Sequence, residues 1–81
     1  MNNNNSIDVS TSQTARDAVR LDFNPSNCDR VTRIKIFAAA FITECEFLKG
    51  ETSAKREVDI AITNIETAAM RAVKAATKDL K

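Results

Sequence analysis

The sequence predicts an all-α fold, in which a short N-terminal helix precedes a long antiparallel two-helix hairpin that assembles into a compact homo-oligomer. The composition is the first observation: the chain has one glycine, one proline and no tryptophan or tyrosine, which is poor material for a β-sheet. The second is a pair of long stretches in which apolar residues recur at helical spacing. The third is the short link between these stretches, which requires the two helices to run antiparallel.

Length and charge limit the classes of protein to consider. Eighty-one residues make one small domain, which buries only about 60% of its unfolded surface, so assembly is one way to complete the core. The net charge of +1 does not suit a polycation that binds DNA or RNA polymers. No apolar run approaches the ~20 residues that span a bilayer, and no signal peptide is visible. Without histidine or a CxxC motif there is no zinc site, and we expect no cofactor.

The N-terminal part divides into a tail and a short helix. Residues 1–11 are rich in Asn and Ser and read as a disordered polar tail, so we place a single helical hairpin domain at residues 12–81. Ser10, Thr11 or Ser12 can cap a short helix through residues 13–21. Residues 22–27 then form a turn, where Asn24 and Asn27 are candidate caps of the next helix.

The hairpin is predicted from two apolar seams. The second helix should run over residues 28–49, with apolar residues at spacings of 3, 4, 3, 4 and 3: Val31, Ile34, Ala38, Phe41, Cys45 and Leu48. Gly50 stands where a left-handed residue is expected after a helix, and Thr52 or Ser53 should cap the third helix. That helix repeats the pattern with Ala54, Val58, Ala61, Ile65, Ala68, Ala72 and Ala75.

Further apolar residues lie outside these seams. The second helix carries an additional ridge of Ile36, Ala40 and Phe47, and the third carries Ile62, Ala69 and Ala76. A helix with two apolar faces needs two partners. Either these residues widen a three-helix core, or copies of the chain associate; we favour self-association, because a monomer rarely exposes such a patch.

Cations gather at the open end of the predicted hairpin. They are Arg30, Arg33, Lys35, Arg71, Lys74, Lys78 and Lys81, against Asp29 and Asp79. Arg30 and Arg33 follow a helix start, where positive charge is disfavoured unless an anion or carboxylate is near. The pattern predicts a small anion-binding site, and the alternative is an ordinary capped helix with solvated charges.

The residues give little support to catalysis. There is no histidine to act as a base or to activate a thiol, and Glu44 and Glu66 lie on different helices. We therefore expect a binding protein and no catalytic residue. A small nucleic-acid-binding protein would use the same basic end with steep salt dependence, and a structural adaptor would use the second apolar ridge; both stay open as alternatives.

Several motifs together resemble a known family. FNPS, V-x-x-I-K, AAAFI and TNIETAAMRAVKAATK lie within residues 23–78 and are similar to the hairpin domain of phage anti-CBASS sponges, which is related to anti-Thoeris sponges for cyclic ADP-ribose derivatives. The resemblance implies a homohexamer with ligand pockets between protomers. It implies that the protein sequesters cyclic oligonucleotides in the host cytoplasm without cutting them. Arg71 departs from the family pattern, which has an aromatic residue there.

The resemblance and the residue chemistry together give a candidate site. A cyclic dinucleotide on a two-fold axis would meet each residue twice. Lys35 would contact a phosphate, Phe23 and Pro25 would wall the bases, and Asn24 and Ser26 would read polar edges, with Arg30 adding positive charge. A cyclic trinucleotide would prefer a three-fold axis, where it would meet Thr63, Arg71 or Lys74. The alternatives are a hydrophobic staple for Phe23, and simple surface positions for Lys35, Thr63 and Arg71.

Overall fold

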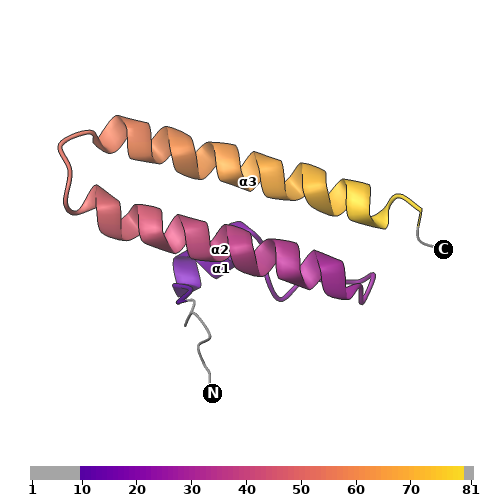
Figure 1. Ribbon diagram of the computed structural model, residues 1–81. Helices are drawn as coiled ribbons and strands as arrows, with labels where there is room; N and C mark the ends of the chain where they lie inside the picture. Colours follow the sequence, from indigo (N-terminus) through magenta and orange to yellow (C-terminus); the bar gives the residue numbers. More distant parts are fainter. Residues whose placement is uncertain (1–9, 80–81) are drawn as a thin grey trace, which may run out of the picture.

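The computed structural model describes residues 10–79, which form three helices. Helix α1 spans Gln13–Ala18, α2 spans Asp29–Lys49 and α3 spans Lys55–Thr77. Helices α2 and α3 form an antiparallel hairpin, and α1 packs against α2 (Figure 1). No strand occurs in this part of the chain, so the prediction of an all-α hairpin is confirmed for it. Most of the tail predicted at residues 1–11 lies outside the described residues.

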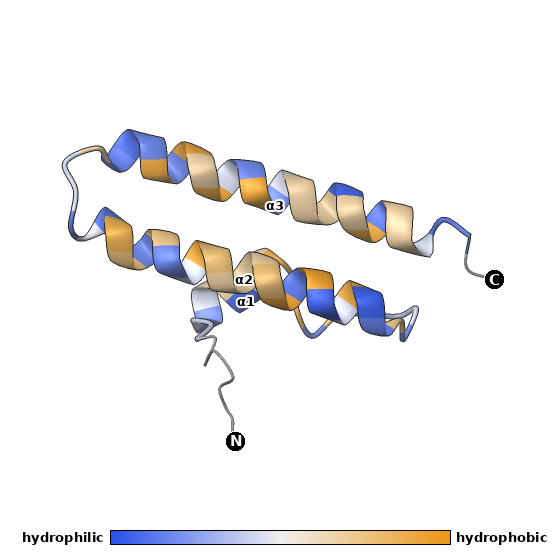
Figure 2. Cartoon of the chain, viewed as in Figure 1, coloured by the Kyte–Doolittle hydropathy of each residue, from blue (hydrophilic) through white to orange (hydrophobic). Residues whose placement is uncertain are grey.

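The core lies where α1 meets the hairpin. Its buried members are mostly small: Ala15, Val19, Ala38, Ala39, Ile42 and Ala69. Small side chains let helix backbones approach closely, and the partly buried Leu21, Ile34, Ile62 and Ile65 pack around them. Figure 2 shows that apolar residues continue along α2, including the face turned to the viewer. The core therefore uses only part of the apolar surface of the hairpin.

Helix α1 is shorter than predicted, because the chain turns left-handed after Ala18. Arg20 has φ 54°, the N–H of Leu21 bonds the carbonyl of Arg16 at 2.9 Å, and the N–H of Arg20 bonds that of Asp17 at 3.1 Å. This pair of bonds is a Schellman motif, with Arg20 at the position that glycine usually holds. The turn directs Leu21 onto the core, so the prediction of a helix through residue 21 was wrong.

The start of α1 is fixed to α2 by one residue. Ser12 is its N-cap: its Oγ accepts from the N–H of Ala15 at 3.0 Å. The same hydroxyl donates to Glu46 Oε1 at 2.7 Å, and the Ser12 N–H donates to Thr43 Oγ1 at 2.9 Å. A six-residue helix has little stability of its own, so these contacts and the core hold it in place.

Neither asparagine of the turn caps α2. The N-cap is Cys28, which makes no side-chain capping bond. Asn24 instead donates through Nδ2 to the carbonyl of Cys28 at 2.9 Å and to Thr32 Oγ1 at 3.0 Å. Asn27 adopts φ 56°, a left-handed conformation that asparagine tolerates. The asparagines therefore shape the turn, and α2 begins one residue later than expected.

The hairpin loop also differs from the prediction. Gly50 has φ −75° and continues the right-handed turn, with its N–H bonded to the carbonyl of Phe47 at 3.1 Å. The N-cap of α3 is Ala54, while Thr52 Oγ1 accepts from the Ala54 N–H at 3.1 Å. Lys55 Nζ donates to the carbonyls of Lys49 and Thr52 at 2.6 and 3.1 Å. Because this lysine satisfies the carbonyl at the end of α2, the loop closes without a left-handed glycine.

Candidate functional site

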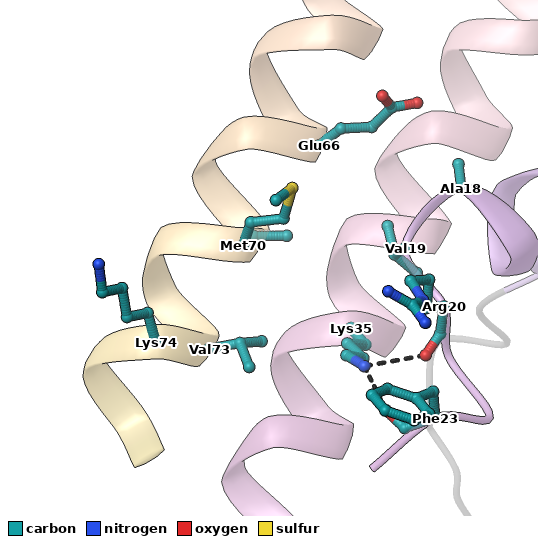
Figure 3. A pocket seen from close by; sticks show the side chains of 10 residues that line it. Ala18, Val19, Arg20, Phe23, Lys35, Glu66, Met70, Val73 and Lys74 are labelled. Atoms are coloured by element: carbon teal, nitrogen blue, oxygen red, sulfur yellow. Dashed lines mark hydrogen bonds between the residues drawn. The ribbon is translucent and has the colours of Figure 1, made fainter. Parts of the chain in front are cut away.

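Two neighbouring pockets lie between the loop that follows α1 and the hairpin. The hairpin pocket, a cavity of about 290 Å³, is lined by Ala18, Val19, Arg20, Phe23, Lys35, Glu66, Ala69, Met70, Val73 and Lys74. Figure 3 shows that these side chains come from the end of α1 and the loop that follows it, from α2 and from α3. The loop pocket, of about 240 Å³, is lined by Phe23, Asn24, Pro25, Ser26, Val31, Lys35, Val73 and Thr77.

The loop pocket gathers residues that the sequence singled out. All four residues of the FNPS turn line it, and so does Lys35 of α2. Ser26 Oγ donates to Asn24 Oδ1 at 2.6 Å and accepts from the Cys28 N–H at 3.3 Å. The turn is thus ordered by its own side chains, and it presents an aromatic ring, a proline and a hydroxyl to one cavity.

Phe23, Lys35 and Val73 line both pockets. Phe23 is 53% exposed, so much of this residue is open to a ligand. The Arg20 guanidinium carbon lies 4.6 Å from the ring centroid and Lys35 Nζ lies 5.7 Å from it. Both distances suit cation–π contacts. The arrangement offers a flat apolar surface flanked by positive charge, which suits a base joined to a phosphate.

Lys35 is buried, and its ammonium already forms hydrogen bonds within the chain. Its side chain is only 7% exposed, and Nζ donates to the carbonyl of Arg20 at 2.9 Å and to the carbonyl of Phe23. Burial, together with the positive charge of Arg20, lowers the pKa of Lys35 below its usual value. The alternative of a simple surface position is therefore wrong for Lys35, which fastens the loop to α2 and also lines both pockets.

The remaining predicted residues are not brought together in the described chain. Lys74 lines the hairpin pocket from α3. Arg30, Thr63 and Arg71 are exposed and line neither pocket.

Arg20 and Met70 line the hairpin pocket but were not singled out from the sequence. Arg20 had been placed inside a helix, where its side chain would have pointed elsewhere. Only the Schellman turn brings Arg20 over Phe23, and a non-glycine residue at that position gives no sequence signal.

The described residues offer little to a metal ion or a nucleophilic mechanism. Within residues 10–79 no three His, Cys, Asp or Glu side chains are grouped as metal ligands. Cys28 and Cys45 are both free thiols. Burial, with Glu44 and Glu46 beside it, raises the pKa of Cys45, which disfavours the reactive thiolate. No helix in this part of the chain has the length and apolarity needed to cross a membrane.

Comparison with known families gives one result that agrees with the geometry. A family model described as the Acb2/Tad1 hairpin domain matches residues 13–77, from the first residue of α1 to the last of α3. Searches of curated proteins and of solved structures gave no match. The match includes every residue that lines the two pockets. The chain therefore belongs to the Acb2/Tad1 hairpin-domain family, whose members are cyclic-nucleotide sponges that bind rather than catalyse.

Proposed function

We propose that this chain sequesters cyclic di- and trinucleotide second messengers in the host cytoplasm and so blocks CBASS antiviral signalling. The observation that carries the proposal is the family match over residues 13–77. The two pockets support it, because they join an aromatic ring to cations at the end of the hairpin. The absence of histidine agrees with binding without cleavage.

The proposed contacts follow from the chemistry of a cyclic nucleotide. Its bases would stack on Phe23, a contact worth about 1–3 kcal/mol per base, and rest against Pro25. Asn24 and Ser26 would meet polar edges of a base or sugar. The cations that line the pockets, Lys35 and Lys74, together with Arg30 at the start of α2, would supply the positive field for the phosphates.

We further propose that the protein is a homohexamer. Large apolar side chains remain exposed in the single chain, including Phe37 at 65%, Phe47 at 62% and Met70 at 73%. An apolar hollow of about 420 Å³ runs between α2 and α3, lined by Ile34, Phe37, Ala38, Phe41, Ile65, Ala68, Ala69 and Ala72. A second copy would cover this surface. A two-fold axis would then double the loop pocket, and a three-fold axis would bring together copies of Thr63, Arg71 and Lys74.

Thermal shift and calorimetry test the binding proposal. Cyclic di-AMP, cyclic GMP-AMP, cyclic tri-AMP and cyclic ADP-ribose would be added separately to the purified chain. A ligand that binds only the folded protein raises its melting temperature. We expect a cyclic di- or trinucleotide to give the largest shift, and we expect it to be recovered intact after heat denaturation of the complex. Recovery of linear products, or no shift with any cyclic nucleotide, would refute the sponge proposal.

A second candidate is a sponge for cyclic ADP-ribose-type Thoeris signals. The matched family description joins the two sponge types, and the pockets contain no feature that excludes a smaller ring. Preference for cyclic ADP-ribose over every cyclic oligonucleotide in the same panel would favour this candidate. Tight binding of RNA or DNA polymers with steep salt dependence would instead indicate a nucleic-acid-binding protein.

The oligomer is tested by light scattering coupled to gel filtration. Phe41→Asp places a charge in the apolar hollow between α2 and α3 and should reduce the hexamer to smaller species. Asn64→Asp adds the same charge at an exposed position of α3 outside that hollow and serves as the control. A monomeric unmodified chain would refute the hexamer.

A further inference from the structure

We infer that Arg20 is a ligand-contacting residue of the hairpin pocket, where its guanidinium binds an anionic group of the sequestered nucleotide. The inference rests on the proposed function and deepens it. It assigns the contact to a position before the FNPS turn, outside the motifs that carry the family resemblance. Three observations support it: the backbone conformation, the placement of the side chain and the surrounding charge.

The backbone at Arg20 is held in a conformation that its residue type disfavours. Its φ is 54°, in the left-handed region where a Cβ is unfavourable and glycine is preferred. Residues held in such regions persist where the surroundings fix them, and they are frequent at ligand sites. Here Arg20 and Leu21 close the Schellman motif with bonds to Asp17 and Arg16, and Lys35 Nζ binds the Arg20 carbonyl. Hydrogen bonds to the N–H and the carbonyl of Arg20 therefore hold its backbone in place. No hydrogen bond between described residues involves its side chain.

The fixed backbone points the side chain at the pocket. The guanidinium stacks on Phe23, with 4.6 Å between its central carbon and the ring centroid. Figure 3 shows it on the same side of the loop as Lys35, facing α3. Stacking orients the planar group by one face and leaves its N–H donors at the edge free to bind a phosphate in bidentate fashion.

The charges around Arg20 also favour an anion. Arg20 lies near Lys35, a buried cation whose pKa it lowers, so the two positive charges repel each other in the free protein. The ion pairs between described residues are Arg16–Asp22 and Lys49–Asp59, and no hydrogen bond between described residues engages the Arg20 guanidinium. Glu66 lines the same pocket from α3 but forms no ion pair with Arg20. A phosphate beside Arg20 would relieve the repulsion.

Lys35 and Arg20 therefore have different tasks. Lys35 donates two of its three N–H groups to the carbonyls of Arg20 and Phe23, so it is a positioning residue for the loop. Arg20 retains its donors and is the cation that meets the ligand. From the sequence, Lys35 was expected to make the phosphate contact.

Arg20→Gly separates the binding role from the structural one. Glycine adopts φ 54° without strain, so the variant should keep the Schellman turn and melt at the same temperature as the unmodified chain or about 4 °C higher. Loss of the guanidinium should weaken binding of the best cyclic nucleotide by about tenfold or more. Asn27→Gly is the matched control, because Asn27 is the other left-handed residue (φ 56°) and lines neither pocket. It should leave affinity within about twofold.

Calorimetry measures the affinity of each protein for cyclic di-AMP, cyclic GMP-AMP and cyclic tri-AMP, and melting curves of the free proteins measure their stability. Together the two measurements either support or overturn the inference. Weaker binding by Arg20→Gly with undiminished stability supports the inference. Unchanged affinity overturns it while leaving the proposed function standing. Weaker binding together with a lower melting temperature also overturns it, because Arg20 would then act through the fold. If the unmodified chain binds none of the three nucleotides, the proposed function and this inference fail together.

Discussion

Lys35 Nζ donates a hydrogen bond to the carbonyl oxygen of Arg20, 15 residues earlier in the chain, at 2.9 Å. A second bond from the same ammonium reaches the carbonyl of Phe23. One side chain of α2 thereby holds the loop on which both pockets depend.

Replacing Lys35 with methionine should destabilise the protein by about 2 kcal/mol, because the carbonyls of Arg20 and Phe23 lose their buried donor. Urea unfolding at a fixed protein concentration measures the change. Lys74→Met removes an exposed lysine and should cost no more than about 0.5 kcal/mol. Affinity for cyclic dinucleotides should fall at least about tenfold in Lys35→Met, since the loop that carries Arg20 and Phe23 is released. Equal stability of Lys35→Met and the unmodified chain would show that the clamp contributes nothing.

The stability of the protein should respond to pH through Lys35. Its pKa in the folded protein is lowered from 10.5, first by burial and then by Arg20. Between the lowered pKa and 10.5 the unfolded chain binds more protons, so stability rises with pH in that window. Below both pKa values the lysine is charged in both states, and the cost of burying the charge is fully present. The free energy of unfolding of the unmodified chain should therefore increase relative to Lys35→Met as pH rises toward 10.5, and a parallel pH dependence would contradict this.

Ser12→Ala should loosen α1 from the hairpin. The substitution removes the capping bond to the Ala15 N–H and the bond to Glu46, and capping losses of this kind cost about 1 kcal/mol. Hydrogen exchange at the amides of Ala15 and Arg16 should accelerate relative to amides in the middle of α3. Ser53→Ala, at an exposed position of the hairpin loop, is the control and should leave these rates unchanged. Unaltered exchange in Ser12→Ala would mean that the core alone holds α1.

Gly50→Ala should be tolerated and should stabilise the protein by about 0.4–1 kcal/mol. Gly50 has a right-handed φ of −75°, and an added Cβ would lie 3.5 Å from the Phe47 carbonyl oxygen, an ordinary contact. The unfolded chain would lose conformational freedom at no cost to the folded state. Thermal melting of the two proteins measures the effect. A loss of stability would instead indicate that Gly50 adopts the left-handed conformation expected from the sequence.

Cys45 should react slowly with alkylating reagents near neutral pH. Cys45 is 7% exposed, and burial with its two glutamate neighbours raises the pKa of its thiol, so little thiolate is present. Mass spectrometry after a timed iodoacetamide pulse should find Cys28, which is half-buried, modified first. The rate at Cys45 should rise as pH increases toward its raised pKa. Faster labelling of Cys45 than of Cys28 would show that the end of α2 next to the hairpin loop opens readily.

The antiparallel hairpin could be predicted from local patterns in the sequence. The spacing of Val31, Ala38 and Cys45 along α2 put these residues in the buried set of that helix, because helical periodicity is a local property that each stretch carries in its own residues. The FNPS turn and Lys35 were also placed together, since the turn directly precedes the helix that holds Lys35. Ser12 was among the candidate caps of the first helix for the same local reason.

The tertiary structure alone decided the details of the pockets. Where α1 ends depends on Leu21 reaching the core, and the left-handed Arg20 follows from that packing rather than from its residue type. The burial of Lys35 depends on two carbonyls that the turned loop brings to it. A charged side chain looks the same in sequence whether it faces water or a backbone carbonyl, and contacts between distant residues distinguish the two. For this reason the sequence located the candidate site, but the division of roles between Lys35 and Arg20 required the fold.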